Sequence, residues 1–220
     1  MIELPLFPLH TVLFPGMPLT LHVFEERYKL MIRRCLEQTL TFGVVLIEHG
    51  AEALGPLPVP YRIGCTAHIL EVETLSQGRL NISALGRSRF LIETLDAETQ
   101  PYLIGQVSLI PLPGEDTAAL RRADRRLRGW VERYLQALKR AGQIDTVPIE
   151  HLPRDPLAFA YLAATLLQVP PLQKQALLAA PDALQLVTDL NVLYRREVTL
   201  LAALLEKPGD SRRAENFRLN

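Results

Sequence analysis

Two prolines and one glycine within four residues, Pro111-Leu112-Pro113-Gly114, divide this 220-residue chain into two stretches with different hydrophobic patterns. Proline and glycine interrupt helices and strands alike, so no regular element is expected to cross this point. Before it, apolar residues alternate with polar ones or form short β-branched runs, as in strands; after it, they recur at helical spacing. The sequence therefore predicts an α+β fold, with a β part at residues 1–112 and a helical part at residues 113–208.

The β part begins with a segment that contains Pro5 and Pro8. Proline cannot donate a hydrogen bond to a neighbouring strand, so we expect an edge strand or a covering arm here. A turn at Pro15-Gly16 leads into a short strand at Pro18–Val23, and a helix is expected from Phe24 to about Gln38. The apolar face of this helix would consist of Phe24, Tyr28, Met31, Ile32, Cys35 and Leu36. The opposite, polar arc would consist of Glu25, Glu26, Lys29, Arg33 and Arg34.

Further strands follow at short intervals along the chain. Phe42–Ile47 is a nearly continuous apolar run, which indicates a strand covered on both faces. A hairpin is expected around Ser76-Gln77-Gly78, and two more strands before the Pro-Gly break. The expected hairpin arms and strands are Gly64–Glu73, Arg79–Gly86, Arg89–Thr94 and Leu103–Leu109. Several short strands this close together predict a closed or nearly closed β-barrel, which hides strand edges.

The segment Gly50–Arg62 interrupts this series of strands. It carries Pro56, Pro58 and Pro60, so it cannot supply a regular ladder, and we expect a surface loop.

The helical part is expected to contain four helices. The first runs from about Asp116 to Arg140, and the second from Leu157 to Leu167 with Asp155 as N-cap and Pro156 in the first turn. A short helix at Gln173–Ala180 and a long helix complete the bundle. The long helix is expected to have Asp182 as its N-cap and to run to about Glu206. The inward residues of the last helix would be Leu186, Leu190, Leu193, Leu201 and Leu204. Residues 209–220 are polar and are predicted to be a disordered tail.

Charge and cysteine content limit the classes of function. Lys and Arg total 24, as do Asp and Glu, so no overall field attracts nucleic acid or an anionic membrane. No signal-peptide core and no apolar run near the ~20 residues of a membrane span is present. Cys35 and Cys65 form neither a disulfide framework nor a metal-ligand spacing, so we expect reduced, buried cysteines in a cytoplasmic protein.

The usual motifs of energy-dependent or hydrolytic enzymes are missing from the sequence. No G-x-x-x-x-G-K-[ST] run could cradle a nucleotide phosphate, and no serine lies in a G-x-S-x-G context. The five histidines are widely separated along the chain, so no metal site is indicated. We therefore expect a non-enzymatic, ATP-independent protein without a cofactor.

Several short motifs in the first ninety residues form a recognisable set. They are Pro5-Leu6-Phe7-Pro8-Leu9, Leu13-Phe14-Pro15-Gly16, Leu21-His22-Val23-Phe24-Glu25, Arg27-Tyr28, Phe42-Gly43-Val44-Val45-Leu46, Gly64-Cys65-Thr66-Ala67, Gly78-Arg79 and Gly86 to Phe90. Together they resemble the N-terminal substrate-binding domain of Lon-type ATP-dependent proteases. The chain departs from the usual pattern at Glu26, where many members carry proline, and at Cys65-Thr66.

This resemblance implies both a fold and a role. The fold would be a PUA-like pseudo-barrel followed by a helical bundle that ends in a long helix. A chain of this length resembles the recognition half of a Lon protease without its ATPase and peptidase domains. We therefore expect binding of unfolded or specific protein clients, as an adaptor or regulator of protein turnover. A protease and a second copy of the chain are further candidate partners.

Apolar side chains near the expected loop and first helix are the candidate contacts for such clients. They are Phe7, Phe14, Met17, Phe24, Tyr28, Leu57, Val59 and Tyr61. The expected surface lies between the barrel and the helical part, with the Gly50–Arg62 loop as its rim. The competing interpretation is that most of these side chains belong to the core. Glu25 and Arg27 could likewise form a recognition cluster, or Glu25 could simply stabilise the start of the helix.

Two alternatives remain open at this point. A cluster of arginines on the first helix of the bundle could bind RNA phosphates, and PUA relatives include RNA binders. Its members are Arg121, Arg122, Arg125, Arg126 and Arg128. Interspersed acids and the absence of interleaved aromatic residues favour a solvated helix face instead. An unrecognised hydrolase is the least favoured alternative, because no nucleophile and base can be assembled from spacing.

Overall fold

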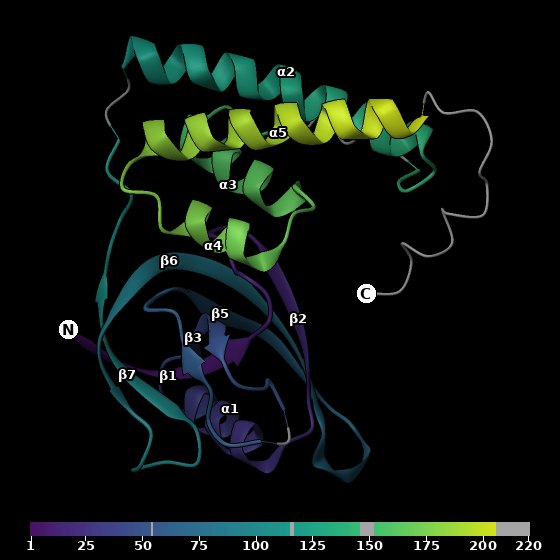
Figure 1. Cartoon of the computed structure of the whole chain (residues 1–220). Helices are drawn as coiled ribbons and strands as arrows, with labels where there is room; N and C mark the ends of the chain where they lie inside the picture. Colours follow the sequence, from purple (N-terminus) through teal and green to yellow (C-terminus); the bar gives the residue numbers. More distant parts are fainter. Residues whose placement is uncertain (54, 115–116, 146–151, 206–220) are drawn as a thin grey trace.

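The computed structural model describes residues 1–53, 55–114, 117–145 and 152–205. A ring of strands forms one end of the molecule and a group of helices forms the other (Figure 1). The expected α+β fold is confirmed. The predicted tail at residues 209–220 lies outside the described residues, as does part of the segment before the second helix of the bundle.

Among the described residues, seven strands make up the sheet, and five of them close into a ring. The strands are β1 (Ile2–Leu9), β2 (Pro18–Val23), β3 (Thr41–His49), β4 (Val59–Pro60), β5 (Ile63–Thr74), β6 (Leu80–Asp96) and β7 (Leu103–Leu109). Their order is β1-β7-β6-β5-β3-β4, and a parallel pairing of β1 with β3 closes the ring. β2 pairs with β6 outside this order. The expected barrel is therefore confirmed.

The position of β1 corrects one expectation. It is neither an edge strand nor a covering arm, because it lies between β7 and β3 in the ring. Its two ladders overlap only at Leu6: Ile2–Leu6 pair with β7, and Leu6–Leu9 pair with β3. Pro5 and Pro8 each lie where one ladder alone is present. A proline can occupy a strand whose other edge is unpaired at that position, so both are accommodated.

Two further strands differ from expectation. The segment Leu80–Asp96 is one continuous strand rather than two, and it pairs with β5, β2 and β7 along its length. The strand passes through Gly86, where an added Cβ would lie 2.1 Å from the Phe14 carbonyl oxygen. The Gly50–Arg62 segment contains the two-residue strand β4, whose pairing with β3 is irregular. A short bulged pairing tolerates the prolines that exclude a regular ladder.

Helix α1 (Glu26–Gln38) lies at the end of the barrel that faces away from the other helices (Figure 1). Tyr28, Met31, Ile32 and Cys35 are buried as expected, whereas Phe24 and Leu36 are 48% and 41% exposed. Lys29, which lies on the polar arc of the helix, is buried.

Lys29 is buried because its side chain reaches the turn of the β5–β6 hairpin. Its ammonium Nζ lies 2.8 Å from Glu26 Oε1 and donates a hydrogen bond to the Gln77 carbonyl at 3.3 Å. The aliphatic stem of a lysine can cover apolar surface while its charged end finds polar partners. The helix and the hairpin turn are therefore joined by this side chain.

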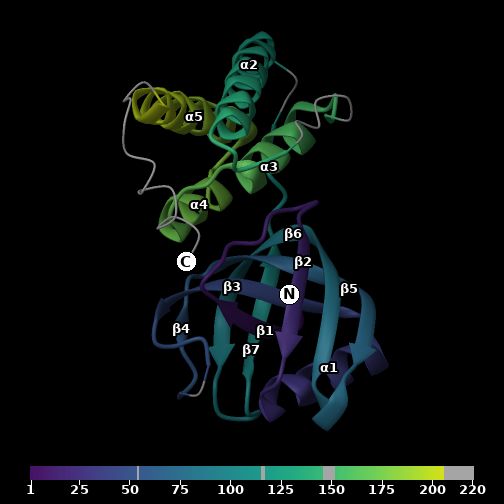
Figure 2. The ribbon, with the colours of Figure 1, turned by 90° about the vertical axis from the view of Figure 1, so that its right-hand side faces the viewer.

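Within the described ranges, four helices form the other end of the molecule. They are α2 (Ala118–Arg140), α3 (Pro156–Leu166), α4 (Pro171–Leu178) and α5 (Ala183–Leu205). α4 lies nearest to the barrel, and α2 and α5 form the outer layer (Figures 1 and 2). The Asp155 carboxylate accepts a hydrogen bond from Ala158 N, as expected of an N-cap. Asp182 caps α5 similarly, but the expected inward residue Leu204 is 69% exposed.

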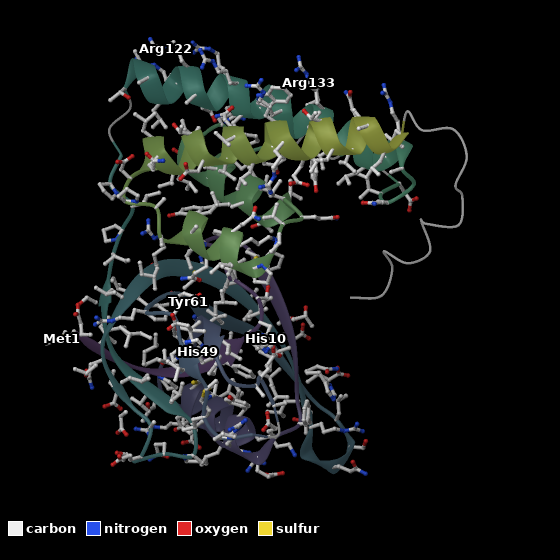
Figure 3. The ribbon with its side chains drawn as sticks, viewed as in Figure 1. Met1, His10, His49, Tyr61, Arg122 and Arg133 are labelled. Carbon is white, nitrogen blue, oxygen red and sulfur yellow. The ribbon has the colours of Figure 1, made fainter. Side chains whose placement is uncertain are left out.

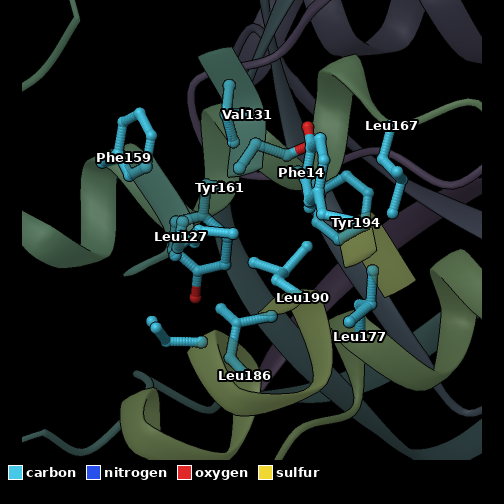
Figure 4. Packing of buried hydrophobic residues seen from close by; sticks show 14 of the residues in the cluster. Phe14, Leu127, Val131, Phe159, Tyr161, Leu167, Leu177, Leu186, Leu190 and Tyr194 are labelled. Atoms are coloured by element: carbon cyan, nitrogen blue, oxygen red, sulfur yellow. The ribbon is translucent and has the colours of Figure 1, made fainter. Parts of the chain in front are cut away.

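One hydrophobic cluster joins the barrel to the helices. Phe14 and Leu46 from the β part pack with Leu127, Tyr161 and Leu177 of the helical part in this cluster (Figure 4). The Gln175 side chain also donates a hydrogen bond to the Ile63 carbonyl at 2.9 Å. The two parts therefore share a core, and a domain boundary at residue 112 stays a prediction.

Candidate functional site

A hollow of about 240 Å³ opens in the barrel wall between β1 and β2, next to the start of α1. Most of its lining comes from these three elements, and the rest from the β2–α1 connection and the loop after β3. The lining residues are Phe7, Leu9, Thr20, Leu21, His22, Val23, Phe24, Glu25, Tyr28, Glu52 and Ala53.

The hollow exists because β1 and β2 are not paired with each other. Among the described residues, β2 forms a ladder with β6 alone, and Phe7–Leu9 of β1 form one with β3 alone. Each strand therefore has backbone groups that no strand partner of the described chain uses on this side. An unpaired strand edge is a ready template for an additional extended chain.

The floor of the hollow is aromatic. The rings of Phe7 and Tyr28 are stacked, with centroids 4.2 Å apart and planes 14° from parallel, and Phe42 lies behind them. Phe7 and Tyr28 are 6% and 2% exposed, so their rings are largely covered. Stacked rings make a rigid apolar surface.

The hydroxyl of Tyr28 is an unusual feature of this floor. It is buried and has no hydrogen-bond partner among the residues that the structure describes. Leaving such a group unsatisfied costs roughly 1–3 kcal/mol. Burial, opposed by Arg27 and reinforced by Glu25 and Glu52, raises the pKa of Tyr28 to about 12. The phenol therefore stays neutral at physiological pH and can both donate and accept a hydrogen bond.

Charged groups lie near Tyr28. Arg27 Nη2 lies 2.9 Å from Glu25 Oε2, and its Nη1 donates a hydrogen bond to the Gly55 carbonyl at 3.1 Å. The guanidinium also lies 4.8 Å from the centroid of the Tyr28 ring. The Glu52 carboxylate accepts a hydrogen bond from His10 N at 2.8 Å, which holds the loop against the barrel. Two carboxylates and one guanidinium thus act on Tyr28 at this site.

Phe24 provides an exposed apolar group at the edge of the hollow. Its side chain is 48% exposed, and its ring lies 6.4 Å from that of His22. Covering a half-exposed phenylalanine with an apolar partner stabilises the complex. The hollow therefore combines a covered aromatic floor, an exposed aromatic edge and unpaired strand edges.

The structure brings together three of the eight apolar residues proposed from the sequence. Phe7, Phe24 and Tyr28 line the hollow. Phe14 is fully buried beside Tyr161, so it belongs to the core between barrel and helices and not to a surface. Met17 packs against two hydrophobic clusters, one of which joins the barrel to the helices. The expected surface between the barrel and the helices is thus filled by packed side chains.

The remaining three candidates do not line the hollow. Leu57 packs against a separate cluster in the barrel, and Tyr61 packs against the core shared with the helices. Val59 is 53% exposed on β4. Sequence reasoning missed Glu52, although the proline-rich loop that carries it was expected to form a rim. The sequence signal that could have indicated Glu52 was its acidic side chain within that loop.

The arginine cluster on α2 is divided by the structure. Arg121, Arg122, Arg125 and Arg126 are exposed on the outer side of the helix, where Figure 3 shows Arg122 pointing away from the molecule. Arg128 is not part of that face. Its Nε lies 2.8 Å from Asp124 Oδ2, and its guanidinium lies 4.0 Å from the centroid of the Phe159 ring. The expected five-arginine face is corrected to four residues.

A second hollow of about 310 Å³ lies beside the β6–β7 turn. Its charged groups already have partners within the chain. Arg34 pairs with Glu3 at 3.6 Å and donates a hydrogen bond to the Tyr102 hydroxyl at 3.4 Å, and Asp96 accepts from two backbone amides. This hollow offers less unmet hydrogen-bonding capacity than the one beside Tyr28.

No group of three or more His, Cys, Asp or Glu side chains in the described part of the chain could hold a metal ion. Both cysteines are free and buried, and burial raises the pKa of Cys35 to about 11 and that of Cys65 to about 12. No helix among these residues has the length and apolar character to cross a membrane.

Comparisons with known proteins find matches that cover most of the chain. The model of the ATP-dependent protease La (LON) substrate-binding domain matches residues 3–193. Lon protease 2 of Herpetosiphon aurantiacus is 28% identical over 209 residues, which cover 91% of this chain and 24% of the relative. The Lon protease of Porphyromonas gingivalis is 30% identical over 118 residues, 52% of this chain and 14% of the relative. The chain thus spans about a quarter of these relatives or less.

Solved structures agree with the fold. A Lon N-terminal domain protein from Xanthomonas campestris matches with a TM-score of 0.61 and 27% identity, over 92% of this chain and 98% of the other. The N-terminal domain of a Mycobacterium avium complex Lon protease matches with a TM-score of 0.66 over 88% of this chain and 98% of the other. At 18% identity the second match shows the fold alone.

Proposed function

Because the chain belongs to the family of the ATP-dependent protease La (LON) substrate-binding domain, we propose that it is a non-catalytic module that binds exposed apolar segments of other proteins. The observation that carries this proposal is the hollow beside Tyr28. It offers an aromatic floor and the half-exposed Phe24 next to strand edges that have no strand partner in the described chain.

The geometry suggests how a client would bind. An extended segment would place its backbone along the unpaired edge of β2 and an apolar side chain against Phe24 and the floor. Burying one such side chain contributes about 1.5–3 kcal/mol. Ordering a flexible segment opposes binding, so the affinity for a single segment would be modest. Folded clients bury their apolar segments and would not compete.

This binding activity would serve protein turnover. The chain would select clients for a protease as an adaptor, or regulate how many clients reach it. The cytoplasm is the compartment that fits two free, buried cysteines. The sequence lacks a nucleotide-binding loop, which supports a role that does not depend on ATP.

A binding titration tests the proposal. Fluorescence anisotropy would compare the purified protein's affinity for an unfolded client with its affinity for the same client in its folded form. We expect binding to the unfolded form only. Phe24→Ser should weaken it by about five- to thirtyfold, equivalent to about 1–2 kcal/mol.

The control substitution is Val192→Ser. Val192 is 63% exposed on α5 and does not line the hollow, so this variant should bind the client as the parent protein does. Equal loss of affinity in both variants would contradict the proposed site, and failure to bind either form of the client would contradict the function.

A further inference from the structure

The polar groups of the hollow indicate which apolar segments it would prefer, and this inference rests on the proposed function. We propose that the hollow selects extended peptides that carry a cationic nitrogen beside their apolar side chain. The nitrogen would donate a hydrogen bond to the Tyr28 hydroxyl and pair with the Glu52 carboxylate. A lysine, an arginine or a free N-terminal amine could supply it.

The first argument is the unmet hydrogen-bonding capacity of Tyr28. Its hydroxyl is buried and has no partner among the described residues, and Tyr28 itself lines the hollow. A ligand group that donates a hydrogen bond to this hydroxyl would satisfy it. An entirely apolar ligand would leave the hydroxyl unsatisfied.

The second argument is charge. The Glu25 carboxylate is paired with Arg27, whereas no cation in the described chain forms an ion pair with Glu52. The hollow and its neighbouring guanidinium therefore carry one excess negative charge, from two carboxylates and one guanidinium. A cationic group on the ligand neutralises this excess, and an acidic group would be repelled.

The N-terminus of α1 does not reverse this preference. The positive end of a helix attracts anions, but Glu25 and Glu26 already occupy the first positions there. Glu26 is in turn paired with Lys29 outside the lining of the hollow. The remaining unpaired charge near Tyr28 is therefore that of Glu52.

A set of matched peptides tests the inference. Four of the peptides have an acetylated N-terminus, one leucine, and a variable residue two positions after the leucine. This spacing is chosen because residues two apart in an extended chain face the same side. The variable residue is lysine, arginine, glutamine or glutamate. A fifth peptide carries glutamine and a free N-terminal amine. Dissociation constants would be measured at low and at high salt.

We expect the lysine and arginine peptides to bind at least fivefold tighter than the glutamine peptide, and the glutamate peptide to bind weakest. High salt should reduce these differences. Glu52→Gln should make the lysine and glutamine peptides nearly equal, and Tyr28→Phe should weaken the lysine peptide more than the glutamine peptide. Tighter binding by the free amine would identify the chain terminus as a source of the cation.

The outcomes separate the inference from the function on which it rests. Equal binding of all five peptides, weakened throughout by Phe24→Ser, would retain the function and overturn the charge preference. No binding by any peptide would overturn both. Glu71→Gln is the control, because Glu71 is exposed on β5 and does not line the hollow. A loss of discrimination in that variant would also overturn the inference.

Discussion

Tyr28 and Tyr194 are two buried tyrosines whose hydroxyls differ in hydrogen bonding. The Tyr28 hydroxyl has no partner in the described chain, whereas the Tyr194 hydroxyl donates a hydrogen bond to the Ala163 carbonyl at 2.8 Å. The same substitution should therefore have different effects on stability at the two positions.

We expect Tyr28→Phe to leave the free energy of unfolding unchanged or to raise it by up to about 1 kcal/mol, because it removes an unsatisfied buried group. Tyr194→Phe should lower it by about 1–2 kcal/mol, because a carbonyl loses its donor. Urea denaturation of both variants measures the difference. A large loss of stability in Tyr28→Phe would mean that its hydroxyl is satisfied in solution.

At the residue scale, local patterns identified capping residues well and buried charges poorly. Asp155 and Asp182 were predicted as caps because the cap bonds a residue only three positions away. Lys29 was placed on a solvated arc, since its partner at Gln77 lies in a distant hairpin turn. Glu52 was missed for the same reason: its proximity to Tyr28 depends on how a loop folds back over β1 and β2.

At the scale of elements, positions along the chain could be predicted more completely than pairings. The bounds of β2 and β7 agree with those expected from alternation and turn residues. The place of β1 between two ladders could not be predicted, because proline at Pro5 and Pro8 excludes a donor without showing which edge is used. The hollow likewise arises from a pairing that β1 and β2 do not make.

Gly86 allows a close approach between β6 and the turn before β2, and its replacement should be costly. An added Cβ would lie 2.1 Å from the Phe14 carbonyl oxygen, and backbone atoms cannot move aside as a flexible side chain would. We expect Gly86→Ala to lower the free energy of unfolding by at least about 2 kcal/mol.

Gly129→Ala is the matched control, because nothing lies within 4 Å of the Cβ that it would add in α2. Alanine is the better helix former, so this variant should gain up to about 1 kcal/mol. Urea denaturation measures both variants, and equal effects would contradict the close approach at Gly86.

At the scale of the whole molecule, the sequence predicted two parts but not how they meet. Helical and strand periodicities showed which residues need burial, and Phe14 and Tyr61 were accordingly recognised as apolar candidates. Periodicity does not show which element covers a residue, so these two were assigned to an open surface. In the structure they pack into or against the cluster that joins the barrel to the helices.

This shared cluster predicts cooperative unfolding of the two parts. Phe14→Ala should lower the free energy of unfolding by about 3–5 kcal/mol, as for other buried phenylalanines. Trp130 fluorescence would report on α2, and amide hydrogen exchange in β5 and β6 would report on the barrel. Both signals should shift together. Two separate transitions in the parent protein would show that the barrel and the helices unfold independently.

The unpaired strand edges between β1 and β2 have a consequence for the rates at which guest peptides associate and dissociate. A peptide that binds along β2 would add hydrogen bonds at the unpaired edge of this strand, and the ladders of β1 with β3 and of β2 with β6 would stay intact. The host would then need no unfolding step to admit a guest and no refolding step to release one. Turnover of guests would be governed by the guest's own ordering, and one host molecule could sample many guests in succession.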